Sequence, residues 1–247
     1  MQKEGFLSIF ENEKPVMGML HLKGDNPDDI FERFKKELNI YLESDIDAVI
    51  LETYYNSYSN LERALKYVDS LDMPIPYGVN CLNLDTMGFY LAKKYHAQFV
   101  QIDSVVGHVK PRDEEGLGAF FDLMRSYYDG YVIGGVRFKY QPLLSENSLE
   151  DDLKIAMTRC DGICVTQDRT GQETSVEKIK EFKKIIGNFP LIVAAGLTPE
   201  NALKSFKYCD AAVCGSYFKD NHKDEGELYA PHIEELMNVV KQIRRQK

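Results

Sequence analysis

The stretch VAAGLTPENA, residues 193–202, joins the end of a short apolar strand to the start of a helix. Valine and two alanines fit a buried strand, and Gly196 ends the apolar run. Thr198 and Pro199 are typical of the N-cap and the first position of a helix. A glycine at this junction serves either a tight turn or the close approach of an anion to free backbone N–H groups.

The same strand–helix unit recurs along the chain. Apolar runs predict strands over residues 16–22, 48–52, 75–80, 99–102, 131–138, 162–166, 190–194 and 211–214. Helical patterns follow these strands over residues 28–44, 61–71, 85–96, 149–158 and 233–245. A helix that ends near residue 128 follows a loop at 107–118, another runs from the cap Ser175 to residue 186, and another begins after Thr198. Asp85 is expected to cap the helix over 85–96.

This alternation predicts an α/β protein with a parallel sheet and crossover helices. Eight units of about 30 residues favour a closed (β/α)8 TIM barrel, with residues 1–247 as a single domain. The alternative is an open Rossmann-like sheet. It requires G-x-G-x-x-G after an early strand, and that motif is absent.

Composition excludes several classes of partner. The net charge of −9 argues against a nucleic-acid-binding surface, and we expect the basic tail, residues 241–247, to complement a helix dipole. No apolar run is long enough for a transmembrane segment, and no secretory signal precedes the first strand. The five cysteines lack a C-x-x-C pair, so we expect a reduced, cytoplasmic protein with no metal site and no cofactor.

Active sites of such barrels lie at the carboxyl ends of the strands. Polar or glycine residues follow every predicted strand here: His21, Glu52, Asn80, Asp103, Arg137, Lys139, Thr166, Asp168, Gly196, Thr198, Gly215 and Ser216. A barrel with a purely structural role does not need acids, an amide and two cations on one rim.

The loops after the seventh and eighth strands are where such barrels commonly bind phosphate. Gly196 and Gly215 end these two strands, Thr198 caps the next helix, and Ser216 adds a hydroxyl donor. Residues 215–219 are expected to form a short extra helix. Gly171, after the sixth strand, joins the same predicted phosphate-binding group. The alternative is that each glycine serves only a turn.

The candidate catalytic residues each have a structural alternative. Burial would raise the pKa of Glu52 and suit it to proton transfer, whereas a salt bridge to Lys139 or Arg137 would be structural. Asp103 could share the acid and base roles, or hold a divalent cation with Glu52, although no histidine spacing supports a metal. Lys139 could form a Schiff base, pair with an acid or anchor phosphate.

The remaining candidates lie around the same rim. Asp168 and Arg169 either enter the site or form a surface ion pair. His21 is either ligand-facing or buried with its ring hydrogen-bonded, and Asn80 and Thr166 are expected to contact substrate. The aromatic loop at residues 54–58 could stack on a sugar or base, or form the contact of a homo-oligomer. We expect residues 220–227 to be a solvated connection.

Six stretches, in order over nearly the whole chain, resemble the BtpA family: GMLHL (18–22), VILETYYN (49–56), GVNCLNLD (78–85), VTQDRTG (165–171), AAGLTPEN (194–201) and AVCGSYFKD (212–220). The resemblance implies a TIM barrel of the ribulose-phosphate-binding type, and it brings no settled reaction. The chain departs from the family pattern where it reads Gln101-Ile-Asp103 for Arg-Val-Asn. The fifth predicted strand of the family carries an aspartate and two histidines. This chain lacks them and reads GGVRFKY at residues 134–140.

Together these observations predict a protein that binds a small phosphorylated metabolite. The favoured interpretation is an enzyme acting on a phosphorylated sugar or nucleoside-like compound, as an isomerase, a lyase or a glycosidic hydrolase. The alternatives are a non-catalytic assembly or biogenesis factor and a phosphate-ligand-binding protein on the same barrel.

Overall fold

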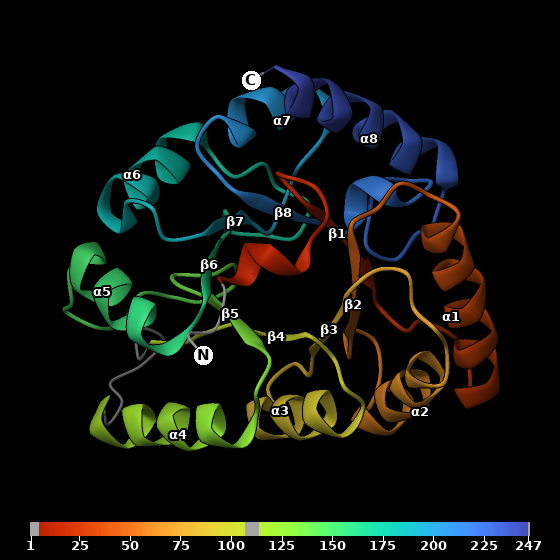
Figure 1. The fold of residues 1–247 in the computed structure, drawn as a ribbon, viewed down its shortest axis with the longest axis horizontal. Coiled ribbons are helices and arrows are strands. Elements are labelled where there is room, and N and C mark those ends of the chain that lie inside the picture. Colours follow the sequence, from red (N-terminus) through yellow and green to blue (C-terminus); the bar gives the residue numbers. More distant parts are fainter. Residues whose placement is uncertain (1–4, 107–113, 247) are drawn as a thin grey trace.

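The computed structural model describes residues 5–106 and 114–246, and eight parallel strands close into a barrel in this part of the chain (Figure 1). The strands pair in sequence order, and β8 pairs with β1. They are β1 Val16–Leu20, β2 Ala48–Glu52, β3 Tyr77–Asn80, β4 Phe99–Ile102, β5 Tyr131–Gly135, β6 Gly162–Val165, β7 Leu191–Val193 and β8 Ala211–Cys214. The predicted (β/α)8 TIM barrel is therefore confirmed.

A helix follows each strand and covers the outside of the barrel (Figure 1). The helices are α1 Pro27–Leu42, α2 Tyr58–Asp69, α3 Asp85–Lys94, α4 Glu114–Tyr127, α5 Leu149–Arg159, α6 Val176–Ile186, α7 Pro199–Phe206 and α8 Ala230–Arg245. Side-chain caps begin several of them. For example, Asn26 accepts from two N–H groups of α1, and Ser175 accepts from Lys178 N. No described helix has the length and apolarity that a membrane crossing requires.

Two apolar clusters hold the barrel together. The larger one lies between the strands and the helices, and the smaller one fills the barrel interior. Phe6 and Phe10, from the 3-10 helix η1 Phe6–Ile9 and its end, belong to the interior cluster with Phe99. They pack edge-to-face, at 5.2 Å between Phe6 and Phe10 and 5.6 Å between Phe6 and Phe99. The interior is thus a packed core, and open space lies at its mouth.

Some element boundaries differ from the prediction. Strand β5 ends at Gly135, because the backbone turns into the left-handed region at Arg137, where φ is 49°. Asp85 is the first residue of α3 and Leu84 is its N-cap. The loop predicted at 107–118 overlaps residues 107–113, which lie outside the described residues, and α4 already begins at Glu114.

Candidate active site

The alternation of side chains along the strands brings the polar group together at one mouth of the barrel. Met19, Ile50 and Phe99 point into the interior cluster. Because side chains two residues apart share a face of a strand, His21, Glu52 and Gln101 continue the same inward rows toward the carboxyl end. These three side chains line one small cavity there.

Glu52 is the buried acid of this group, with 5% of its surface exposed. Its Oε1 accepts a hydrogen bond from Asn80 Nδ2 at 2.8 Å. Burial raises the pKa of Glu52 to about 8, the nearby Asp103 adds to the rise, and the Lys139 charge opposes it. The carboxyl group is therefore mainly protonated at neutral pH.

His21 lies beside Glu52, with Nε2 3.5 Å from Oε2 of that residue. Burial, together with the charges of Lys219 and Lys139, lowers the pKa of His21 to about 3. Its Nδ1 makes no hydrogen bond to a described side chain, although the backbone of Asp224 weakly favours protonation. The imidazole is therefore neutral. It is buried and also lines the cavity, but within the described part of the chain its Nδ1 lacks the hydrogen bond that the buried alternative included.

Asp103 is joined to Glu52 through Asn80, whose Nδ2 also donates to Asp103 Oδ1 at 3.2 Å. Gln101 Nε2 approaches the same oxygen at 3.4 Å. Desolvation raises the pKa of Asp103, and Lys139 and the two amide donors oppose that rise. One amide nitrogen therefore connects the two carboxyl groups on which proton transfer would depend.

Lys139 supplies positive charge next to these acids. It lines the same cavity as Glu52, and its charge favours the ionised forms of Glu52 and Asp103. Its backbone N–H donates to Thr166 Oγ1 at 2.7 Å. Because Thr166 is fully buried, its hydroxyl fixes the backbone at Lys139. Thr166 does not line the cavity described here.

The cavity itself is small, with a volume of about 30 Å³, which is enough for a water molecule. Four residues of the predicted phosphate group share its lining with His21, Glu52, Gln101 and Lys139: Gly171, Gly196, Gly215 and Ser216. The same four residues line a neighbouring pocket of about 430 Å³, together with Thr198, Glu200, Tyr217 and His222. All five predicted phosphate-binding residues thus border one continuous region.

Unused backbone donors gather in this region. The N–H groups of Gly171, Gly196 and Gly215 make no hydrogen bond to another group within the described ranges. Ser216 begins the predicted short helix, the 3-10 helix η3 Ser216–Phe218. A Cβ on Gly171 would lie 3.5 Å from Ser216 Oγ, so the loops after β6 and β8 meet here. The arrangement suits an anion, because three backbone N–H groups without a hydrogen-bond partner among the described residues belong to residues that line the same two pockets.

Gly196 also has a structural requirement. Its φ is +69°, and a Cβ would lie 2.2 Å from Gln172 O. Only glycine fits this conformation and this close backbone approach. Asn201 then ties the turn to α7, because its Nδ2 donates to Gly196 O at 2.8 Å and its Oδ1 accepts from Thr198 N at 2.9 Å. The tight turn and the free donor are therefore compatible at one residue.

Two sequence candidates lie apart from this group. Arg137 Nε donates to the fully buried Asp152 of α5 at 3.0 Å, and its Nη2 donates to Asn147 O at 2.9 Å. Asp168 is exposed, its backbone oxygen accepts from Tyr140 N at 3.0 Å, and its carboxylate charge acts on Lys178. The structure does not bring either side chain to the cavity.

Tyr54, from the predicted aromatic loop, lies beside the cavity together with residues that were not among the sequence candidates. Tyr54 packs its ring 4.8 Å from that of His21, and its hydroxyl lies 3.3 Å from Thr170 Oγ1. Thr170 N donates to Tyr140 Oη at 3.0 Å. Asp224 accepts hydrogen bonds from Tyr54 and Tyr55, which favour its ionised form against desolvation. The aromatic loop at 54–58 was a signal for such a cover, but its partners lie far away in sequence.

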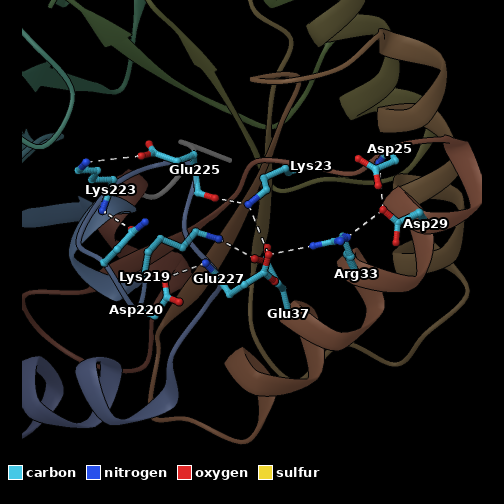
Figure 2. Close-up of polar contacts among 11 residues, drawn as sticks. Lys23, Asp25, Asp29, Arg33, Glu37, Lys219, Asp220, Lys223, Glu225 and Glu227 are labelled. Atoms are coloured by element: carbon cyan, nitrogen blue, oxygen red, sulfur yellow. Dashed lines mark hydrogen bonds and ion pairs between the residues drawn. The ribbon is translucent and has the colours of Figure 1, made fainter.

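The acidic loop after β8 is held against the first strand–helix unit (Figure 2). Lys23 and Arg33 both contact Glu227 Oε1, at 3.4 and 2.8 Å. Lys219, which is 2% exposed, pairs with Glu37 at 2.6 Å. Residues 220–227, expected as a solvated connection, are mostly exposed. Ion pairs nevertheless hold this segment against α1, and it places Asp224 next to Tyr54 and Tyr55.

The donor set does not resemble a metal centre. In the described part of the chain, no cluster of three or more histidine, cysteine, aspartate or glutamate side chains is arranged to hold a metal ion. The five cysteines are all buried as free thiols. The side chains at the mouth are two carboxyl groups, a neutral imidazole, amides and an ammonium group.

Comparison of the chain with known proteins identifies its family. The model of the BtpA family matches residues 12–242, so the chain belongs to the BtpA family. An uncharacterised protein of Methanocaldococcus jannaschii is 26% identical, with 94% of this chain and 97% of that protein covered. An uncharacterised protein of Pyrococcus horikoshii is 25% identical, with 94% and 98% covered.

Solved structures share the fold at low identity. A structure described as "Native KDPGal structure" has a TM-score of 0.65 at 13% identity and covers 94% of this chain and 96% of that one. Phosphoribosyl anthranilate isomerase from Thermus thermophilus has a TM-score of 0.59 at 11% identity, with 93% and 99% covered. Thiamine phosphate pyrophosphorylase from Pyrococcus furiosus has a TM-score of 0.58 at 13% identity, with 93% and 96% covered.

Proposed function

We propose that this member of the BtpA family is an enzyme that acts on a small phosphorylated sugar or nucleoside-like metabolite. One observation carries the proposal. The cavity that Glu52 and Lys139 line is also lined by Gly171, Gly196, Gly215 and Ser216, the residues suited to phosphate. A ligand held at the glycines would therefore reach the acid and the ammonium group without leaving the barrel mouth.

The phosphate would lie against the loops after β7 and β8. The free N–H groups of Gly196 and Gly215 and the Ser216 hydroxyl would donate to its oxygens, and Gly171 would close the third side. Thr198, at the start of α7, places a helix N-terminus along the adjoining pocket. The named relatives of the fold, an isomerase of a phosphoribosyl compound and a thiamine phosphate pyrophosphorylase, are consistent with such a ligand.

Glu52 and Asp103 would divide the proton transfers. Glu52 carries its proton at neutral pH, because its pKa is raised to about 8, and so it can donate to a carbonyl or leaving-group oxygen. Asp103, the more exposed of the two acids, would be the partner that accepts a proton from carbon or water. Lys139 would stabilise negative charge on the reacting oxygen.

These roles are shared by isomerases, lyases and glycosidic hydrolases, so the proposal covers all three. In the first two, a proton leaves the carbon next to a carbonyl and the enolate oxygen gains the charge that Lys139 balances. His21 and Asn80 would hold Glu52 in place. Arg137 and Asp168 would act outside the reaction, as the ion-pair partner of Asp152 and as a surface carboxylate.

A second candidate, a non-catalytic partner-binding factor, rests on an apolar groove. Leu84, Met87, Tyr90, Leu117 and Phe120 line about 700 Å³ between α3 and α4. Leu84 and Tyr90 are 48% and 44% exposed, and exposed apolar side chains that adjoin one another commonly mark a contact surface for a partner. Such a factor would not depend on Glu52 or Asp103.

Deuterium exchange tests the catalytic proposal without a known product. The protein is incubated in D2O with a set of three- to six-carbon aldose and ketose phosphates, and proton NMR follows the loss of C–H signals. We expect exchange with at least one compound and its loss in Glu52→Gln and Asp103→Asn, with Asp168→Asn as the matched control that retains it. If thermal shifts show that no compound binds, the partner-binding candidate is favoured. Binding without exchange would argue against the isomerase and lyase reactions, and proton NMR of a nucleoside monophosphate, cleaved by water to ribose 5-phosphate and the free base, would then test the glycosidic hydrolase.

A further inference from the structure

Gln101 is a buried amide with an unused acceptor. Its side chain enters the barrel mouth from β4, one layer below Asp103, and only 4% of the residue is exposed. Its Oε1 has no hydrogen-bond partner among the described residues. Such an acceptor loses its water on folding and gains nothing in return, so native proteins seldom retain one without a reason.

The orientation of this amide is fixed by its neighbour. Nε2 faces Asp103 Oδ1 at 3.4 Å. With the amide rotated by half a turn, its oxygen would face Asp103 Oδ1, which already accepts from Asn80 Nδ2, so two acceptor oxygens would meet there. The acceptor Oε1 is therefore held in the cavity that Glu52, Lys139, Gly196 and Gly215 also line.

We infer that Gln101 accepts a hydrogen bond from a hydroxyl group of the ligand, and that the ligand is a polyhydroxylated phosphate ester. The inference rests on the proposed function for the position of the phosphate. Oε1 needs a hydrogen-bond donor. An ionised phosphate oxygen carries no hydrogen to donate, and an alkyl chain has no donor. A hydroxyl supplies the missing donor and can also accept a hydrogen bond.

The order of strands separates the two ends of such a ligand. In the closed barrel, β4 lies four strands from β8 and three from β7, so Gln101 enters the mouth from the side opposite Gly215 and Gly196. The ligand would therefore carry its phosphate at one end and a hydroxyl toward the other, with Glu52 and Lys139 between. Because the cavity holds about 30 Å³, binding requires the cover formed by Tyr54 and Thr170 to move aside.

Calorimetric titration of two near-isosteric variants tests the inference. The probes are inorganic phosphate, n-pentyl phosphate, and the five- and six-carbon sugar phosphates. Gln101→Met removes the acceptor with little change of shape. Gln98→Met makes the same substitution just before β4 at the opposite end of the barrel, where Gln98 Oε1 accepts from Tyr77 N at 2.8 Å. If Gln101→Met does not fold, Gln101→Leu replaces it.

In the wild type and in Gln98→Met, we expect the best sugar phosphate to bind about tenfold more tightly than pentyl phosphate. In Gln101→Met this preference should vanish, while inorganic phosphate binds as before. A preference that survives in Gln101→Met, or that is absent from the wild type, overturns the inference and leaves the phosphate site standing. If no phosphate compound binds the wild type, the proposed function fails, and the inference fails with it.

Discussion

Nε2 of His21 lies 3.5 Å from Oε2 of Glu52, but the two side chains are not an ion pair at neutral pH. Burial lowers the pKa of the histidine to about 3 and raises the pKa of the acid to about 8. Between about pH 3 and pH 8 both groups are therefore uncharged, and the contact joins a neutral imidazole to a neutral carboxyl group. A site of this kind holds its proton ready for donation.

The first prediction concerns the pH dependence of stability. The folded-state pKa of Glu52, about 8, exceeds its ordinary value of 4.5, so its favourable contribution is complete below pH 4.5 and is lost as the pH rises through 8. Relative to Glu52→Gln, the wild type should lose on the order of 3 kcal/mol between pH 5 and pH 8. Urea unfolding of both proteins at several pH values measures the difference. A difference that stays constant would mean that Glu52 is ionised throughout.

The second prediction separates two glycines. Gly196→Ala should destabilise the fold by about 3 kcal/mol or more, because the new Cβ would meet the backbone of Gln172 and φ is positive. Gly215→Ala should cost less, since φ is −125° and the new Cβ would meet the His21 ring at 3.3 Å. Urea midpoints give the two costs. Equal losses would show that the loop after β7 rearranges to admit a side chain.

The third prediction assigns Arg137 to stability. Arg137→Met would leave the fully buried Asp152 without its charged partner, at a cost of about 3–5 kcal/mol. Adding Asp152→Asn should recover part of that loss, which a double-mutant cycle measures. Phosphate affinity of the folded variant should not change. A large loss of affinity at unchanged stability would instead return Arg137 to the site.

Arg137 also shows why part of the site could not be predicted from the sequence. The apolar run 131–138 predicts a strand that continues past Gly135, which would leave Arg137 on the rim. The strand stops two residues earlier, and the left-handed backbone at Arg137 sends the side chain to α5. Hydrophobic periodicity does not encode such a turn. The fold was therefore predictable from the sequence, but the direction of the Arg137 side chain was not.

The inward rows, by contrast, were accessible from the sequence. Two-residue alternation from Ile50 predicts Glu52 at the mouth, and alternation from Phe99 predicts Gln101 and Asp103 together. Gln101 interrupts the apolar run of its strand, and that was the available signal for it. The cover formed by Tyr54, Thr170 and Asp224 depends on contacts between loops more than 50 residues apart, for which local pattern holds no information.

The fourth prediction contrasts two parts of the charged network around the loop after β8 (Figure 2). Lys219→Met should cost about 3 kcal/mol or more, because Glu37 would lose the partner of a largely buried pair. Glu227→Gln should cost less than about 1 kcal/mol, since its contacts with Lys23 and Arg33 are exposed. Chemical denaturation of both variants tests the order. The reverse order would mean that the exposed contacts carry the loop.

The central claim is that an anion binds where the loops after β6, β7 and β8 meet, beside Glu52. The most direct measurement is the anomalous difference density of crystals grown with tungstate, a tetrahedral dianion. The account predicts a tungsten peak within hydrogen-bond reach of the Gly196 and Gly215 N–H groups and Ser216 Oγ. A peak only at the opposite end of the barrel, where Lys241, Arg244 and Arg245 line a pocket of about 500 Å³, would contradict it. The absence of any peak at the glycines at millimolar tungstate would contradict it equally.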